Sequence, residues 1–145
     1  METALTIKLK NELKEVEKLG DIINEWTSSL NLAPTSVFEI SIVFDEIVAN
    51  IIKHGYSDKT EHYIDIALNI NEYIFTATIE DEGIDFNPLD SVKDDRTLLL
   101  KDRDLGGRGI HIIKKYMDLV DYQRKGNKNI LTINRKIKFI KDNID

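Results

Sequence analysis

The sequence predicts an α+β fold, a two-layer α/β sandwich in which helices pack on one face of a mixed, mostly antiparallel sheet. Two observations lead to this prediction. Apolar residues recur at helical spacing in three segments, and they alternate with polar residues in five shorter segments. The strand-like segments of the second half follow one another after short turns, which favours hairpins.

The first half of the chain predicts one strand and two helices. A strand is expected over residues 5–9, where apolar and polar residues alternate. Asn11 can cap a helix that runs toward Leu30. Pro34 suits the first turn of a second helix, and Gly55 is a plausible end for it.

The second half predicts two hairpins and one more helix. Strands are expected over residues 63–69 and 73–79, with a turn at Asn71 and Glu72. A third helix begins near residue 110, and a last hairpin turns around Gly126 and Asn127. Residues 87–106 are polar and long for a connection, so they are expected to form a lid or binding loop.

Composition limits the class of protein. The length of 145 residues suits a single domain over residues 1–145, and the absence of cysteine excludes disulfides and thiolate metal sites. A net charge of -6 argues against sequence-independent binding to nucleic acid. No signal-peptide pattern and no apolar run of roughly 20 residues is present, so a cytoplasmic protein with no membrane span is expected.

One side of the second predicted helix carries polar groups suited to chemistry. Glu46 and Asn50 are four residues apart and share a face, with Lys53 near them and His54 beside it. A carboxylate can accept a proton, and an amide oxygen is a hard ligand suited to Mg²⁺. The alternative is a solvated helix face with a Glu–Lys pair. The opposite side is an apolar stripe of Val37, Ile40, Phe44, Ile47, Val48 and Ile51.

Asp81 and Gly83 follow the end of a predicted strand. A carboxylate there can accept a hydrogen bond from an exocyclic amino group, and a glycine lets a flat base approach the backbone. The alternative is a plain turn, which Asp and Gly both favour. A calcium loop of the EF-hand type is excluded because its required glycine position holds Phe86.

Glycines at positions 106, 107 and 109 precede the third predicted helix. Backbone N–H groups at a helix N-terminus form an anion site when no side chain covers them. A Walker loop is excluded because no Gly-Lys-Ser/Thr follows, and a dinucleotide fingerprint is excluded because Ile112 takes the place of its third glycine. The alternative is a flexible glycine hinge.

The three segments, in this order, resemble the boxes of the GHKL ATPase superfamily, which has the Bergerat ATP-binding fold. Within it the chain most resembles the bacterial anti-sigma factor serine/threonine kinases. The stretches that support this narrower resemblance are residues 44–56, 85–88, 103–110 and 116–118.

The resemblance implies a role for each residue of the site. Glu46 would be the general base, Asn50 would bind Mg²⁺, and Asp81 would accept a bond from the adenine amino group. Gly83 would make room for the base, and Arg103 would approach the γ-phosphate of ATP. Residues 87–106 would be the ATP lid. The remaining residues expected to contact the nucleotide or its phosphates are Lys53, His54, Gly106, Gly107, Arg108 and Gly109.

Three functions are compatible with this reading. The first is a kinase that phosphorylates a serine on a STAS-type anti-sigma antagonist and sequesters a sigma factor or similar target. The second is a nucleotide-gated binding module without efficient phosphotransfer. The third is an interaction protein that binds no nucleotide, a reading suggested by Arg108 between the two glycines. Because the resembled kinases are often homodimers, a homodimer is expected.

Overall fold

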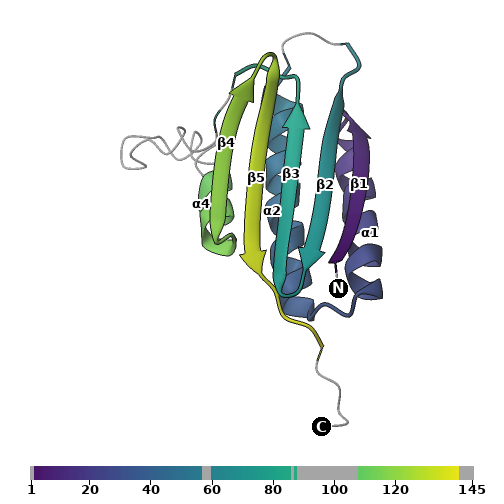
Figure 1. Cartoon of the computed structure of the whole chain (residues 1–145). Helices are drawn as coiled ribbons and strands as arrows, with labels where there is room; N and C mark the ends of the chain where they lie inside the picture. Colours follow the sequence, from purple (N-terminus) through teal and green to yellow (C-terminus); the bar gives the residue numbers. More distant parts are fainter. Residues whose placement is uncertain (1, 57–59, 86, 88–107, 141–145) are drawn as a thin grey trace.

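A computed structural model describes residues 2–56, 60–85, 87 and 108–140. In this part of the chain five strands form one sheet and three helices lie against one face of it (Figure 1). The strands are β1 (Glu2–Lys10), β2 (Tyr63–Asn71), β3 (Ile74–Asp81), β4 (Leu119–Lys125) and β5 (Lys128–Lys136). The helices are α1 (Lys14–Ser29), α2 (Pro34–His54) and α4 (Arg108–Tyr116).

The sheet has the strand order β1-β2-β3-β5-β4, and each neighbouring pair is antiparallel. The predicted α+β class and the placement of the helices on one face are confirmed. Within the described strands the sheet is wholly antiparallel, where the sequence predicted a mixed sheet. This order places the end of β3 beside the start of β5, with Asp81 opposite Asn129.

The core lies between the sheet and the helices. Residues of β2 and β3 alternate between buried and more exposed positions, as expected for a sheet with one covered face. Phe44 of α2 meets Phe75 of β3 edge to face, with ring centroids 6.2 Å apart. The largest fully buried side chains are Phe44, Phe75, Leu9, Leu19, Ile23, Ile40, Ile64, Ile66, Leu68, Ile79, Ile113 and Ile133.

Helix α2 begins and ends where the sequence predicted. Pro34 occupies its first turn, Ala33 is its N-cap residue, and Gly55 follows its last residue. Four of the six residues in the predicted apolar stripe are buried, whereas Val37 and Ile51 are half-buried. Val43 is also buried although it was not assigned to the stripe; it lies three residues after Ile40 and four before Ile47, at the edge of the same face.

Two local predictions were wrong. Asn11 does not cap α1, which starts at Lys14. Its side chain instead accepts a bond from the His62 N–H at 2.9 Å and donates to the Thr60 carbonyl at 3.3 Å. The turn after β2 falls one residue later than predicted, because Asn71 pairs with Ile74 and leaves Glu72, in the left-handed region (φ 55°), in the turn.

The described helices include none that is both long and apolar enough to cross a membrane.

Candidate functional site

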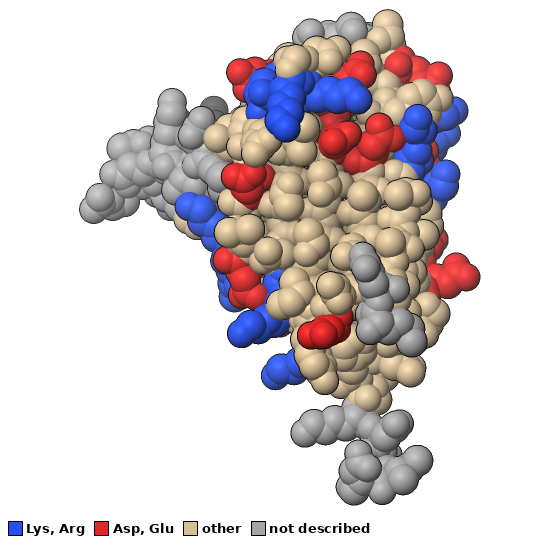
Figure 2. Space-filling model, viewed as in Figure 1, with Lys and Arg blue, Asp and Glu red and all other residues tan. Residues whose placement is uncertain are grey.

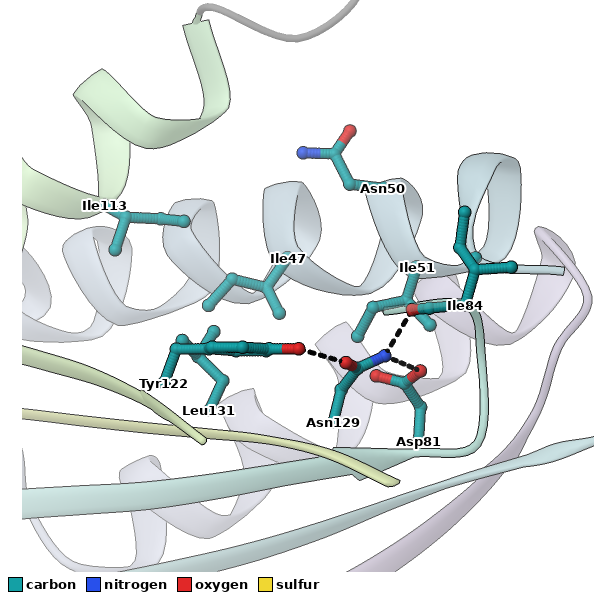
Figure 3. Close-up of a pocket in the computed structure, with 10 residues that line it drawn as sticks. Ile47, Asn50, Ile51, Asp81, Ile84, Ile113, Tyr122, Asn129 and Leu131 are labelled. Atoms are coloured by element: carbon teal, nitrogen blue, oxygen red, sulfur yellow. Dashed lines mark hydrogen bonds between the residues drawn. The ribbon is translucent and has the colours of Figure 1, made fainter. Parts of the chain in front are cut away.

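A pocket opens where α2, α4 and the ends of β3 and β5 meet. Most of its wall is apolar, and its polar groups come from four side chains (Figure 3). The lining residues are Ile47, Asn50, Ile51, Gly55, Asp81, Ile84, Ile113, Tyr122, Asn129 and Leu131. The second predicted helix, the strand that ends at Asp81 and the third predicted helix each contribute at least one residue to this wall.

A backbone hydrogen bond connects the residue that follows α2 with the segment that follows β3. The carbonyl of Gly55 accepts a hydrogen bond from the Ile84 N–H at 2.7 Å. A Cβ atom at Gly83 would lie 2.6 Å from this carbonyl oxygen and 2.7 Å from Asp81 Oδ1. Position 83 therefore requires glycine for the fold itself, because only a residue without a side chain lets the two segments approach this closely. This requirement is separate from the predicted one of making room for a base.

Asp81 lies at the floor of the pocket and is only 6% exposed. Its Oδ1 accepts hydrogen bonds from the Gly83 N–H at 2.8 Å and from Asn129 Nδ2 at 3.1 Å. Burial raises the pKa of this carboxyl, while the two hydrogen bonds and the nearby Arg124 charge act in the opposite direction. Asp81 is thus a buried acceptor beside an apolar wall, as recognition of an amino group requires.

Asn129 is the partner of Asp81 that sequence reasoning missed. Its Nδ2 also donates to the Ile84 carbonyl at 2.8 Å, and its Oδ1 accepts from Arg124 Nη1 at 3.1 Å and from the Tyr122 hydroxyl. The dashed lines of Figure 3 show the bonds that join Asn129 to Tyr122, Asp81 and Ile84. A single amide therefore links four parts of the pocket floor.

Tyr122 contributes both a ring to the wall and a hydroxyl to this network. The hydroxyl also lies 2.9 Å from Asp85 Oδ1. Burial, followed by the hydrogen bond and charge of Asp85, raises the pKa of Tyr122 to about 12. The hydroxyl therefore keeps its proton at any physiological pH and acts as a donor.

A further signal in the sequence could have revealed Asn129 and Arg124. Across the predicted turn at Gly126, which adopts φ 60°, Arg124 pairs directly with Asn129. Arg124 donates to the Gly83 carbonyl at 2.8 Å and is half-buried. Arg135 on β5 pairs with Glu39 and is half-buried too.

The polar side of α2 divides into residues at the pocket and residues beyond it. Asn50 lines the pocket, and Figure 3 shows its side chain on the side of α2 away from Asp81 and Asn129. Glu46 is half-buried one turn earlier, whereas Lys53 and His54 are exposed. Among the described residues, Asn50 alone of these four lines the pocket.

The glycine segment leads into α4 as predicted. Arg108 and Gly109 are the first residues of this helix, and Ile113 in its second turn reaches the pocket wall. Helix α4 therefore contributes to the wall of the site through Ile113. Arg103, Gly106, Gly107 and residues 88–106 of the predicted lid lie outside the described residues.

Comparison with known proteins identifies the family. Residues 9–135 match the histidine kinase-like ATPase domain family. The Anti-sigma F factor of Bacillus subtilis (strain 168) is 29% identical over 80 residues, which is 55% of each chain. That of Bacillus thuringiensis (strain Al Hakam) is 32% identical over 83 residues, 57% of each chain. The matched part spans little more than half the length of these relatives.

Two solved structures share the fold. The RsbU and RsbW domains of a Mycobacterium tuberculosis protein superpose with a TM-score of 0.69 at 14% identity, over 96% of this chain and 35% of that chain. The SiaB–SiaC complex from Pseudomonas aeruginosa gives a TM-score of 0.57 at 15% identity, over 92% of this chain and 89% of that chain.

The resemblance that the three motifs indicated is confirmed by these matches. A nucleotide is the ligand that an ATPase domain binds, and the pocket of Asp81 has an apolar wall and a buried acceptor. From residue 9 to residue 135, the chain belongs to the histidine kinase-like ATPase domain family.

Proposed function

We propose that this chain is an ATP-dependent protein serine/threonine kinase that acts as an anti-sigma regulator. The observation that carries the proposal is the buried Asp81 carboxylate on the floor of an apolar pocket, whose wall includes Ile113 of α4. The similarity to Anti-sigma F factors supports the regulatory part. The kinase activity, its substrate and its partners are proposals of ours.

The chemistry of the pocket lining supports adenine as its ligand. The flat apolar wall of Ile47, Tyr122 and Leu131 suits a ring, and the remaining lone pairs of Asp81 can accept a bond from the exocyclic amino group. The phosphates would extend toward the first turn of α4, where backbone N–H groups favour an anion.

The residues also fit Mg²⁺ held together with a nucleotide. No three His, Asp or Glu side chains gather into a metal site within the described part of the chain. Mg²⁺ usually takes one or two protein ligands and completes its shell with phosphate oxygens and water, so the single amide oxygen of Asn50 is suitable. Bound Mg²⁺-ATP supplies the γ-phosphoryl group, and Glu46 accepts the proton of the attacking serine hydroxyl.

The proposed substrate is a serine on a STAS-type anti-sigma antagonist. Phosphorylation adds negative charge at the contact between the two proteins and separates them. The freed kinase then sequesters a sigma factor or a similar target. The name Anti-sigma F factor, which two relatives carry, supports a target of this kind.

A second candidate function is a nucleotide-gated binding module without efficient phosphotransfer. The observation that favours it is the position of Glu46, which does not line the pocket as Asn50 does. In that case a nucleotide changes the affinity for a partner, and Glu46 has no chemical role.

Phosphotransfer separates the two functions. The purified chain is incubated with γ-labelled ATP, Mg²⁺ and a lysate of the source organism, beside Glu46→Gln and Glu25→Gln variants. Glu25 is exposed on α1 and controls for the loss of one carboxylate. A small protein labelled by the unmutated chain and by Glu25→Gln, but not by Glu46→Gln, supports a kinase. Equal labelling by all three excludes Glu46 as the base, and ATP binding without any labelling favours the binding module.

A further inference from the structure

The side-chain amide of Asn129 uses all of its hydrogen-bonding capacity. An amide has two N–H donors and an oxygen with two lone pairs. The donors go to Asp81 Oδ1 at 3.1 Å and to the Ile84 carbonyl at 2.8 Å. The oxygen accepts from Arg124 and from Tyr122. Asn129 therefore has nothing left to offer a ligand, and its effect on the pocket passes through Asp81.

The orientation of this amide decides whether Asp81 presents a hydrogen-bond acceptor or a donor to a ligand. With Nδ2 toward Asp81, the carboxylate Oδ1 is satisfied by two donors, and these two bonds leave Oδ2 as an acceptor. If the amide were reversed, its oxygen would face the carboxylate. That repulsion favours a protonated Asp81, which is a donor instead of an acceptor. The same pocket would then accept a different nucleobase.

Tyr122 alone cannot hold the amide in this orientation. Its hydroxyl has one hydrogen but lies within reach of two acceptors, Asn129 Oδ1 and Asp85 Oδ1. When the hydrogen points to Asp85, which carries a negative charge, Asn129 loses this donor. The oxygen side of the amide then depends on Arg124, while the Ile84 carbonyl holds its nitrogen side.

Arg124 has the geometry to hold the amide at all times. The two hydrogens of Nη1 serve the Gly83 carbonyl at 2.8 Å and Asn129 Oδ1 at 3.1 Å. A guanidinium keeps its charge and has no acceptor, so the Asn129 oxygen must be the atom that faces it. The same contact fixes the turn between Asp81 and Ile84.

We propose that Arg124 is a positioning residue that sets the nucleobase selectivity of the pocket, by locking the Asn129 amide so that Asp81 presents only an acceptor. The inference rests on the nucleotide binding proposed above. An acceptor-only floor selects an exocyclic amino group, as in adenine, and rejects a keto oxygen, as in hypoxanthine. ADP and IDP differ at this group and therefore make suitable probes.

The test compares the ratio of the dissociation constants for IDP and ADP in several variants, by isothermal titration calorimetry. For the unmutated chain we expect ADP to bind at least about a hundredfold more tightly. Arg124→Ala is expected to lower this ratio by about tenfold or more, and Arg124→Lys to recover part of it. Lys125→Ala is the matched control: it removes the same charge from an exposed neighbour on the other side of β4, and the ratio stays unchanged.

Asn129→Asp provides a second route to the same answer. It is nearly isosteric but has no N–H donors for Asp81, so the ratio is expected to fall even where Arg124→Ala does not fold. An unchanged ratio in folded Arg124→Ala and in Asn129→Asp, with both nucleotides weakened equally, overturns the inference and leaves the proposed function standing. If the unmutated chain binds neither nucleotide, the proposed function fails, and the inference with it.

Discussion

At the scale of single residues, the buried charge of Asp81 serves the proposed ligand recognition at a cost in the stability of the fold. Its carboxyl has a raised pKa because burial favours the neutral form. A folded-state pKa above the unfolded value contributes stability that is present at low pH and lost as the pH rises through the folded-state pKa. At neutral pH the chain therefore keeps a buried charge that weakens the fold but serves as an acceptor.

The Asp81→Asn variant is expected to separate these two effects. The change removes the buried charge, so the free energy of unfolding at neutral pH stays the same or rises, while affinity for ADP falls by about tenfold or more because an N–H now faces the adenine amino group. The affinity of the unmutated chain is expected to decrease as the pH falls through the raised pKa, whereas that of the variant stays flat. Titration calorimetry between pH 5 and 8 measures the ADP affinity of the unmutated chain and of the variant. Parallel pH profiles of the two affinities would contradict the role of Asp81.

Gly83 gives a second prediction at this scale. In Gly83→Ala the new methyl group meets the carbonyl oxygen of Gly55, a backbone atom that cannot move alone. The free energy of unfolding is expected to decrease by about 1–3 kcal/mol, with weaker ADP binding as the pocket floor shifts. Urea denaturation measures the change.

The control for this prediction is Gly20→Ala in α1. A Cβ at Gly20 meets nothing within 4 Å, so this substitution is expected to stabilise the helix by about 0.5–1 kcal/mol. A Gly83→Ala variant that is as stable as Gly20→Ala would show that the close approach of the two backbones is not needed.

At the scale of elements, Arg135 connects three parts of the fold. Its guanidinium forms an ion pair with Glu39 of α2, and Nη1 donates to the carbonyl of Tyr116, the last residue of α4, at 3.2 Å. The Arg135 side chain is 13% exposed and that of Glu39 is 30% exposed. This contact fixes the C-terminal end of α4, three residues after Ile113 of the pocket wall.

Arg135→Met is expected to lower the free energy of unfolding by about 1–3 kcal/mol, because Glu39 and the Tyr116 carbonyl lose their donor in a half-buried position. Lys136→Met removes the charge of the next residue, whose side chain is exposed, and is expected to change stability by less than about 0.5 kcal/mol. Chemical denaturation of both variants tests the contact. A double variant with Glu39→Gln shows whether the loss comes from the ion pair, since the two effects then fail to add.

At the scale of the whole molecule, the two-layer arrangement leaves one face of the sheet without helices. Figure 2 shows that the centre of this face carries few charged residues and that most charges lie around it. One row across the strands consists of Thr6, Ala67, Thr78 and Thr132, which are paired in register, and it ends in Asp121 of the edge strand β4. The contact of the expected homodimer is predicted at this face, because charged residues are depleted at the centre of interfaces and few lie at the centre of this face.

Thr78→Arg places a charge in the middle of this row and is expected to shift a dimer toward monomers by about tenfold or more in dissociation constant. Light scattering over a range of protein concentrations measures the shift. Glu25→Arg introduces the same residue at an exposed position of α1 and is expected to leave the measured mass of the particle unchanged. A dimer that withstands Thr78→Arg would place the contact elsewhere.

The sequence alone determined most of the elements and the centre of the site. Periodicity placed all eight described elements, because an apolar repeat of two or 3.6 residues is a property of consecutive residues. The order of the motifs indicated the family and singled out Asp81, Gly83 and Asn50, all of which lie in or beside the pocket. Local rules failed at Asn11, whose side chain found distant partners in place of the nearby helix end.

Only the tertiary structure decided how the pocket floor is assembled. Asp81 and Asn129 are 48 positions apart, and Gly83 and Arg124 are 41 apart, so no local pattern joins them. They meet because β5 inserts between β3 and β4 in the sheet. The turn at Gly126 paired Arg124 with Asn129 in the sequence itself, but whether that pair faced solvent or a buried carboxylate depended on the strand beside it. The local sequence around Arg124 does not tell whether its side chain is exposed or half-buried, and the packing of a strand distant in the sequence decides this.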